Sequence, residues 1–297
     1  MDTGRADQQV CIGGPLGKTQ PLLKDPRMKR KIQALAGAAF LAMAGSAMAV
    51  PVNIGGLNLT TGPTFGVASV YENVITGTGQ TLSGFGEVTQ INGMSLSELC
   101  AGCELTYRFG GYEVTALSPT SVSFTGGWVN FYLGFGADND FNPFTSGSSA
   151  ADLAAATNGS LFLTLAGHDI DAAGNTFAGS GANIGTPSAV GFGAGLLDVD
   201  NTGAMNGNTA GAGALANAFF DTNGIAAAFG GTADFQIGAS FSSALVPHPG
   251  ECPQGPACLA GSVDIRGTVA AIPEPETYAL MLAGLGVIGF VARRRRA

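Results

Sequence analysis

The sequence predicts a mainly β protein: an antiparallel β-sandwich or jelly-roll-like domain with glycine-rich loops, flanked by a signal peptide and a single C-terminal transmembrane helix. Three observations support this fold class. Glycine accounts for 47 of the 297 residues, about twice its usual share, and only 11% of residues are charged. Several segments alternate apolar and polar residues with the period of a strand. The basic residues gather near the two ends of the chain, beside apolar runs.

A signal peptide is expected at residues 28–49. Lys29-Arg30-Lys31 forms a positive start, and an uncharged apolar run follows from Ile32 to Ala44. Ala47 and Ala49 supply the small residues that signal peptidase requires, so cleavage is expected after Ala49. A buried N-terminal helix is the alternative, but the order of charges, apolar run and small residues favours the signal peptide.

Residues 50–272 are expected to form the exported domain. Residues 1–27 fit no signal peptide and are interpreted as an upstream extension from a mis-assigned start codon. The domain holds sixteen acidic residues and two basic ones, Arg108 and Arg266, so its net charge is −14 and it lacks lysine. Such a surface repels phosphate backbones, which argues against nucleic-acid binding.

The C-terminal segment, residues 273–297, has the pattern of a membrane anchor. Pro273, Glu274 and Pro275 precede an uncharged run that predicts a helix over residues 277–292. Fifteen apolar residues rise about 22 Å, short of the ~30 Å hydrocarbon core, and snorkelling arginines extend the reach. The chain closes with a stop-transfer cluster that is expected to stay in the cytoplasm: Arg293, Arg294, Arg295 and Arg296. The domain would then lie outside the inner membrane.

The combination of Pro273-Glu274-Pro275, a short apolar helix and a terminal arginine cluster resembles the PEP-CTERM sorting signal of Gram-negative bacteria. The resemblance implies that these three residues form the sorting motif, recognised by an exosortase after export through the Sec translocon and signal-peptidase cleavage. It also implies a transient inner-membrane anchor, followed by release or attachment at the cell surface or in the extracellular matrix. Proteins with this signal come from organisms that make exopolysaccharide, biofilm or flocs. The resemblance covers only about residues 273–296 and leaves the exported domain uncharacterised.

Strand patterns recur through the exported domain, separated by glycine- and asparagine-rich loops. The predicted strands are residues 66–75, 82–91, 104–117, 122–135, 160–166, 233–242 and 262–271. Gly110-Gly111 and Gly126-Gly127 mark hairpin turns or bulges within two of them. Residues 150–156 and 212–220 can form short helices. Residues 167–213 are expected to be long loops with short strands.

Four cysteines remain in the exported domain, and an oxidising compartment predicts that they form disulfides. Three connectivities are open. The local pairs, Cys100 with Cys103 and Cys252 with Cys258, are favoured. A thioredoxin-like redox site lacks a βαβ context, and a four-thiolate zinc site is disfavoured by the spacing of the second pair.

Three pairs of aspartates two residues apart are candidate calcium ligands, since calcium prefers oxygen ligands. They are Asp138 with Asp140, Asp169 with Asp171, and Asp198 with Asp200. The last pair begins an EF-hand-like loop, but Thr209 stands where the bidentate glutamate belongs. Aspartates that cap turns are the favoured alternative, so no cofactor is expected and calcium stays a candidate.

The domain is not expected to be an enzyme. His168 beside Asp169 and Asp171 has the residue types of a general base, but no nucleophile accompanies it and G-x-S-x-G and H-E-x-x-H motifs are absent. His248 is expected to be an exposed loop residue. A secreted hydrolase with paired carboxylates stays a lesser alternative.

Trp128 and Tyr132 share one face of a predicted strand, and Phe131 and Phe135 share the other. If the Trp128 face is exposed, it can stack on sugar rings; a tryptophan in the core is the favoured alternative. The leading functional hypothesis is a structural or adhesive protein of an exopolysaccharide matrix, biofilm or floc, and it rests on the sorting-signal resemblance. A carbohydrate- or calcium-binding module is the alternative.

Overall fold

The computed structural model describes residues 52–59, 64–202, 211–243, 246–248, 251–252, 258–268 and 281–286, together with residues 288 and 293. These residues all belong to one compact unit. The expected signal peptide with Ala47 and Ala49, the Pro273-Glu274-Pro275 element and Arg294–Arg296 lie outside the described residues. Of the expected helix 277–292, residues 281–286 are helical. Among the described residues, no helix combines the length and apolar character needed to cross a membrane.

The described domain is mainly β and its strands pair antiparallel, which confirms the predicted class. The strands of the main sheet are β3 (Thr64–Asn73), β4 (Thr81–Ile91), β5 (Met94–Ser95), β6 (Cys103–Ser118), β7 (Ser121–Phe135), β8 (Ser160–His168), β9 (Phe177–Ala182), β10 (Val190–Val199), β13 (Phe235–Ser242) and β14 (Cys258–Gly267). Two small hairpins accompany it: β1 (Val52–Ile54) with β2 (Leu57–Leu59), and β11 (Ile225–Ala226) with β12 (Thr232–Ala233). The helical elements are α2 (Leu96–Leu99), η1 (Gly136–Asp138), α3 (Ser149–Ala155) and α4 (Gly211–Phe220).

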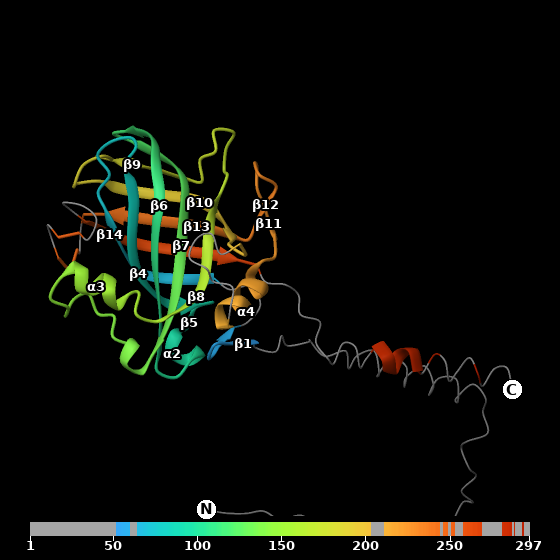
Figure 1. Cartoon of the computed structure of the whole chain (residues 1–297). Coiled ribbons are helices and arrows are strands. Elements are labelled where there is room, and N and C mark those ends of the chain that lie inside the picture. The colour runs from blue at the N-terminus through green and yellow to red at the C-terminus, as the bar shows by residue number, and fades with distance from the viewer. Residues whose placement is uncertain are drawn as a thin grey trace, which may run out of the picture. The chain divides into compact units, whose positions relative to one another are not determined.

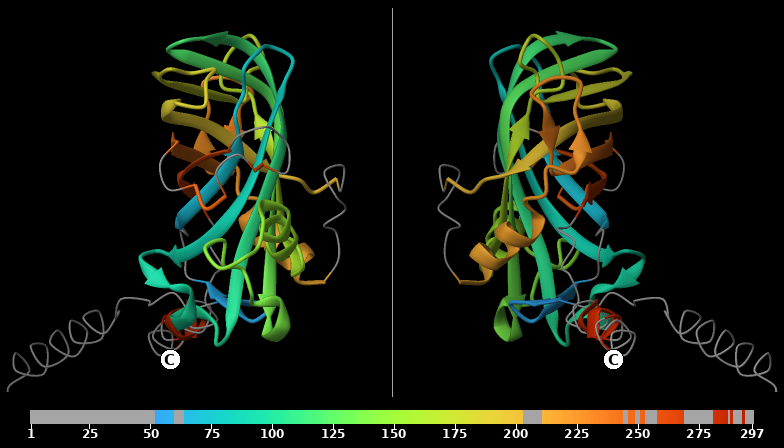
Figure 2. Two further views of the ribbon diagram at one scale, coloured as in Figure 1. Left: turned by 90° about the vertical axis from the view of Figure 1, so that its left-hand side faces the viewer. Right: turned by 90° about the vertical axis from the view of Figure 1, so that its right-hand side faces the viewer.

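The main sheet closes on itself. Its order is β13-β14-β3-β4-β6-β7-β8-β10, and β10 pairs in turn with β13 over seven residue pairs. Strands that follow one another along the chain are therefore adjacent in the sheet at nearly every position. Figures 1 and 2 show the strands turning around a common interior. The predicted sandwich or jelly roll requires two separate sheets, so the structure corrects that expectation. Among the described strands, closure leaves no long edge open to another chain.

One position in this ring is shared by two strands. β8 lies between the C-terminal halves of β7 and β10, while β9 lies between their N-terminal halves. β7 and β10 thus extend past two shorter strands placed end to end. The ten-residue β10 falls within residues 167–213, where only short strands were expected, and that prediction was wrong for β10.

The seven predicted strands all exist, with ends shifted by a few residues, and the two predicted helices correspond to α3 and α4. The glycine pairs in β6 and β7 do not end either strand. Gly111 and Gly127 have φ angles of 73° and 91°, and β6 and β7 continue to pair on both sides of them. An added Cβ at Gly127 would lie 2.2 Å from the ring of Tyr112, so glycine is needed there for close packing.

The main core fills the interior of the closed sheet. Phe65, Phe131 and Phe235 are fully buried there, and the Phe65 ring centroid lies 5.5 Å from that of Phe131 and 6.2 Å from that of Phe235. Phe220 of α4 packs against Phe65 and Phe235, so α4 contributes to the same core. A smaller cluster lies on the outer face under the segment that follows β7, and it consists of Tyr71, Phe85, Phe141, Ala156 and Ala260.

Candidate functional site: a groove on the outer face of the sheet

A row of outward-facing side chains crosses five neighbouring strands at one level. Phe192 on β10 pairs in register with Ser240 on β13, and Ser240 pairs with Ser262 on β14. Beyond a bulge between β14 and β3, Ser69 on β3 pairs with Glu87 on β4. Because alternate residues of a strand face the same side of a sheet, register places these five side chains on one surface.

Two hollows on this surface meet at the middle of the row, and together we call them the outer groove. Their volumes are about 530 and 350 Å³. Ser240 and Ser262 line both, and their hydroxyl oxygens are 3.0 Å apart. The first hollow is also lined by Ser69, Glu87, Asn142 and Phe144, and the second by Phe192, Gln236, Asp264 and Arg266. Four strand spacings of about 4.8 Å give the row a length of about 19 Å.

An exposed aromatic side chain stands in each hollow. Phe144 is 72% exposed and Phe192 is 65% exposed. Exposed phenylalanines are unfavourable in water unless something covers them, and scattered single residues are common. Here the two rings belong to one groove that is also lined by polar side chains. The groove therefore combines flat apolar surfaces with hydroxyl, amide and carboxylate groups.

The loop that carries Phe144 is held in place by its neighbours. Phe141 is buried against Phe85, and its backbone N–H donates to Glu104 Oε2 at 2.9 Å. Asn142 Oδ1 accepts the backbone N–H of Phe144 at 3.2 Å, and Asn142 O accepts that of Ser146 at 3.1 Å. The wall of the groove is thus a fixed turn rather than a free loop.

The His248 side chain holds its own segment of the chain against the loop that carries Phe144. Its Nε2 lies 2.9 Å from Ser146 Oγ and 3.2 Å from Asp152 Oδ2 of α3. The expectation of an exposed His248 was wrong: its side chain is only 18% exposed. A serine relay needs the nucleophile and the carboxylate on opposite ring nitrogens, whereas here both approach Nε2. The geometry indicates an anchor for the loop.

The groove carries more negative than positive charge. Glu87 is partly buried, and burial raises the pKa of its carboxyl group. Arg266 and Asp264 form a loose exposed ion pair at 3.9 Å. With the domain at −14 overall, the groove suits a neutral, hydroxyl-rich molecule better than an anionic one.

Trp128 and Tyr132, the candidates for stacking on sugars, lie half-buried on the outer face of β7 and outside the outer groove, so the favoured expectation of a core tryptophan was wrong. Phe131 between them is fully buried in the interior, as alternation predicts. The Trp128 ring rests on the backbone at Gly110 and Gly111, and the Arg108 guanidinium lies 5.7 Å from its centroid. The ring is thus partly occupied by its own protein.

Sequence reasoning missed Phe144 and Phe192. The available signal for Phe192 was its place between Gly191 and Gly193, which removes neighbouring side chains. For Phe144 it was the Asn142-Pro143 turn that precedes it. Neither signal indicated that the two residues share one surface, since that depends on the closure of the sheet.

The His168 imidazole is fixed at both nitrogens. Nδ1 lies 2.7 Å from Asp198 Oδ2, and Nε2 lies 3.0 Å from the Phe229 carbonyl oxygen. Burial lowers the pKa of His168, but these two hydrogen bonds and the nearby carboxylates outweigh it and raise the pKa above the ordinary value. A general base needs a free nitrogen facing substrate, which this arrangement does not offer.

The three aspartate pairs are not brought together. Asp171 accepts the side-chain amide N–H of Asn175 at 2.7 Å and the backbone N–H groups of Asn175 and Ala173 at 3.1 and 2.9 Å, and these bonds lower its pKa. Asp140 accepts from Asn158 at 2.9 Å, and Asp200 Oδ1 accepts the backbone N–H of Thr202 at 3.0 Å. Asp138 lies in η1, Asp169 follows β8 and Asp198 holds His168.

Across the part of the chain that the structure describes, no three His, Cys, Asp or Glu side chains are grouped for a metal ion. Thr209 lies outside the described residues.

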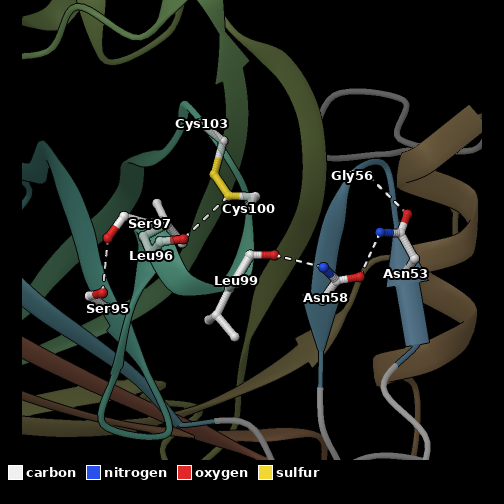
Figure 3. The surroundings of a disulfide bond; sticks show 9 residues. All are labelled: Asn53, Gly56, Asn58, Ser95, Leu96, Ser97, Leu99, Cys100 and Cys103. Carbon is white, nitrogen blue, oxygen red and sulfur yellow. Dashed lines mark hydrogen bonds between the residues drawn. A yellow bond between two sulfur atoms is a disulfide. The ribbon is translucent and has the colours of Figure 1, made fainter.

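The cysteines lie in the two favoured local pairs. The Cα atoms of Cys100 and Cys103 are 5.8 Å apart, and those of Cys252 and Cys258 are 5.3 Å apart, both within the disulfide range. The first disulfide follows α2 (Figure 3). Beside it, Asn58 Nδ2 donates to the Leu99 carbonyl oxygen at 3.0 Å and ties the β1–β2 hairpin to this corner.

A family model for the PEP-CTERM protein-sorting motif matches residues 271–296, at the C-terminus. The chain therefore carries this motif, which confirms the resemblance drawn from Pro273-Glu274-Pro275 and the arginine cluster. The motif supports an exported protein that is sorted by an exosortase, and it implies an exosortase as the processing partner. Neither the curated proteins nor the solved structures contain a match to this chain.

Proposed function

We propose that this chain is a non-enzymatic surface or matrix protein that binds a neutral polysaccharide strand in the outer groove and so contributes to cohesion of an exopolysaccharide matrix, biofilm or floc. In this proposal the Sec translocon exports it, signal peptidase cleaves after Ala49, and the helix 277–292 anchors it transiently in the inner membrane. The exosortase then cleaves near Pro273-Glu274-Pro275.

The outer groove is the observation that carries the binding function. A polysaccharide presents hydroxyl groups along its edges and apolar faces on its rings. Ser69, Ser240 and Ser262 can donate to and accept from such hydroxyls. Phe144 and Phe192 offer the faces on which sugar rings pack. The row of about 19 Å, set by strand spacing, suits an extended chain better than a single small molecule.

The charged side chains of the outer groove indicate which class of polysaccharide it binds. Glu87 and Asp264 face the groove, and Arg266 is the single cation among its lining residues. An acidic polysaccharide would be repelled by these groups and by the net charge of the domain. We therefore favour a neutral glycan. The lesser alternative, a hydrolase, has less support because His168 and His248 are both committed to structural contacts.

Affinity electrophoresis of the purified chain through gels containing soluble β-glucan, dextran or alginate tests the proposal. We expect retardation by a neutral glycan and none by alginate. Phe144→Ala and Phe192→Ala should each weaken binding about two- to tenfold, the usual value of a stacking contact. Phe229→Ala is the matched control, because Phe229 is also exposed but lies outside the groove. Unchanged binding by the double variant, or no retardation by either neutral glycan, would refute the groove as the site.

A further inference from the structure

The interior of the closed sheet holds a carboxyl group in apolar surroundings. Glu72 on β3 pairs in register with Leu259 on β14 and Gly84 on β4, and its side chain lines two adjoining cavities of about 40 and 50 Å³. Leu82, Phe177 and Ala239 line both cavities as well. A cavity of this size has room for a few water-sized groups.

The chain offers Glu72 no cation. The two basic residues between positions 50 and 272 are Arg108 and Arg266. Arg108 lies over Trp128 on the outer face, and Arg266 is two-thirds exposed beside Asp264. Among the described residues, none forms a hydrogen bond or ion pair with the Glu72 carboxylate. An unpaired carboxylate in an apolar site is costly, and burial accordingly raises the pKa of Glu72 to about 8.

Aromatic rings surround the same cavity. Tyr107, Phe109, Tyr112 and Phe177 line it together with Glu72. Successive rings are in contact, with centroids 6.4 Å apart for Tyr107–Phe109 and Phe109–Tyr112, and 5.9 Å for Tyr112–Phe177. The ring faces carry partial negative charge, so a group of them beside a carboxylate is the chemistry that attracts an organic cation.

We infer that the cavity around Glu72 is a binding site for a small alkylammonium cation, held by the Glu72 carboxylate and the rings of Tyr107, Phe109 and Tyr112. The cation supplies the positive charge that the lysine-free domain lacks. Its methyl or methylene groups contact the apolar walls. The acidic domain concentrates cations around itself, which favours entry. The small size of each cavity favours a compact head group over a large ligand.

The site predicts a definite pH dependence. A bound cation stabilises the ionised carboxylate, so binding releases the proton that Glu72 carries below about pH 8. Tyr107 and Tyr112 are the other titratable groups lining the cavity, and burial raises the pKa of both hydroxyls, which keeps them neutral in this range. The side chains from β4, β7, β13 and β14 that face Glu72 there are apolar. Affinity should therefore rise from pH 6 to pH 9.

Calorimetric titration of the purified full-length chain with choline chloride tests the inference, with 3,3-dimethyl-1-butanol as the uncharged analogue of the same shape. We expect choline to bind more tightly at pH 9 than at pH 6, and the alcohol to bind at least tenfold more weakly than choline. Glu72→Gln, which keeps the size of the side chain, should weaken choline binding about tenfold or more.

Glu87→Gln is the control, because Glu87 is a partly buried carboxyl on the outer face. Phe109→Leu is a second variant, which removes a ring while keeping apolar volume. It should also weaken choline binding. Equal affinity for choline and its uncharged analogue, or unchanged choline affinity in folded Glu72→Gln, would overturn the assignment. So would the absence of binding at pH 9.

Discussion

Ser240 and Ser262 lie directly opposite each other on β13 and β14, and their hydroxyl oxygens are 3.0 Å apart where the two hollows of the outer groove meet. This pair is a shared boundary of the two hollows, because both serines line each of them. A ligand that occupies the whole groove must cross this pair. The relationship makes the two serines a sensitive place to block binding.

Ser262→Trp should abolish binding of a neutral polysaccharide. Ser262 is exposed, so the indole can be accommodated without disturbing the core, and it would fill the junction of the hollows. We expect a loss of at least tenfold in affinity and a thermal midpoint close to that of the original protein. Ser97→Trp, at an exposed position on α2, serves as the control in the same electrophoretic assay. Strong binding by Ser262→Trp would mean that the strand does not cross the junction.

Gly193→Ala should destabilise the domain by about 1–3 kcal/mol, the usual cost of overpacking. An added Cβ at Gly193 on β10 would lie 2.4 Å from the ring of Phe177 inside the closed sheet. Gly238→Ala on the neighbouring strand β13 is the matched control, since nothing lies within 4 Å of its Cβ position. Urea unfolding of both variants measures the difference. Equal stabilities would contradict the inward orientation of Gly193.

Stability should fall as the pH rises through the range set by Glu104. This side chain is 3% exposed, and burial chiefly raises the pKa of its carboxyl group to about 7. A raised acid pKa means that the folded state holds the proton more tightly, so stability is greatest below the unfolded pKa of about 4.3 and declines up to about pH 7. Allowing for solvent screening, we expect the free energy of unfolding to fall by about 2 kcal/mol over this pH range.

Glu104→Gln should remove the share of this decline that Glu104 causes, while keeping an acceptor for the Phe141 N–H. The share caused by Glu72, whose pKa burial raises to about 8, should remain. Thermal unfolding between pH 4 and pH 8 measures the decline in stability. The control variant Glu113→Gln, at an exposed position of β6, should leave this decline unchanged. A decline that persists unchanged in Glu104→Gln would show that other groups cause it.

Asp198→Asn should lower the pKa of His168. In the original protein, the hydrogen bond from Asp198 and its charge outweigh the effect of burial on the imidazole. Without that carboxylate, burial dominates and favours the neutral ring. The chain has two histidines, so NMR titration resolves both and His248 serves as the internal reference. A His168 pKa that does not move would contradict the hydrogen bond at 2.7 Å.

Period-two alternation identified β3, β4, β6 and β7 because each has one face in the core. β10 was missed because three of its inward positions are Gly191, Gly193 and Gly195, so its first half lacks the apolar signal of a strand. Rings of neighbouring strands fill that space: added Cβ atoms at Gly191 and Gly193 would meet Phe241 and Phe177. Glycine in a strand often marks such close approach.

The closure of the sheet and the outer groove were also beyond sequence reasoning. Both depend on the pairing of β10 with β13, which no local pattern encodes. Sequence reasoning placed Trp128 and Tyr132 correctly on one face of a strand, but it favoured a core position for Trp128, which lies half-buried on the outer face. The groove that joins Phe144 to Phe192 exists only once distant strands pair. The sorting motif was predictable because it is a contiguous stretch of chain, matched at residues 271–296.

Intact-mass analysis of the product secreted by a host with and without an exosortase tests the central claim most directly. With the exosortase, we predict a chain that starts near Val50, ends near Pro273 and weighs four hydrogens less than its reduced form, because two disulfides have formed. A chain that keeps residues 273–297 in the presence of the enzyme, or one that accumulates in the cytosol with free thiols, would contradict the account.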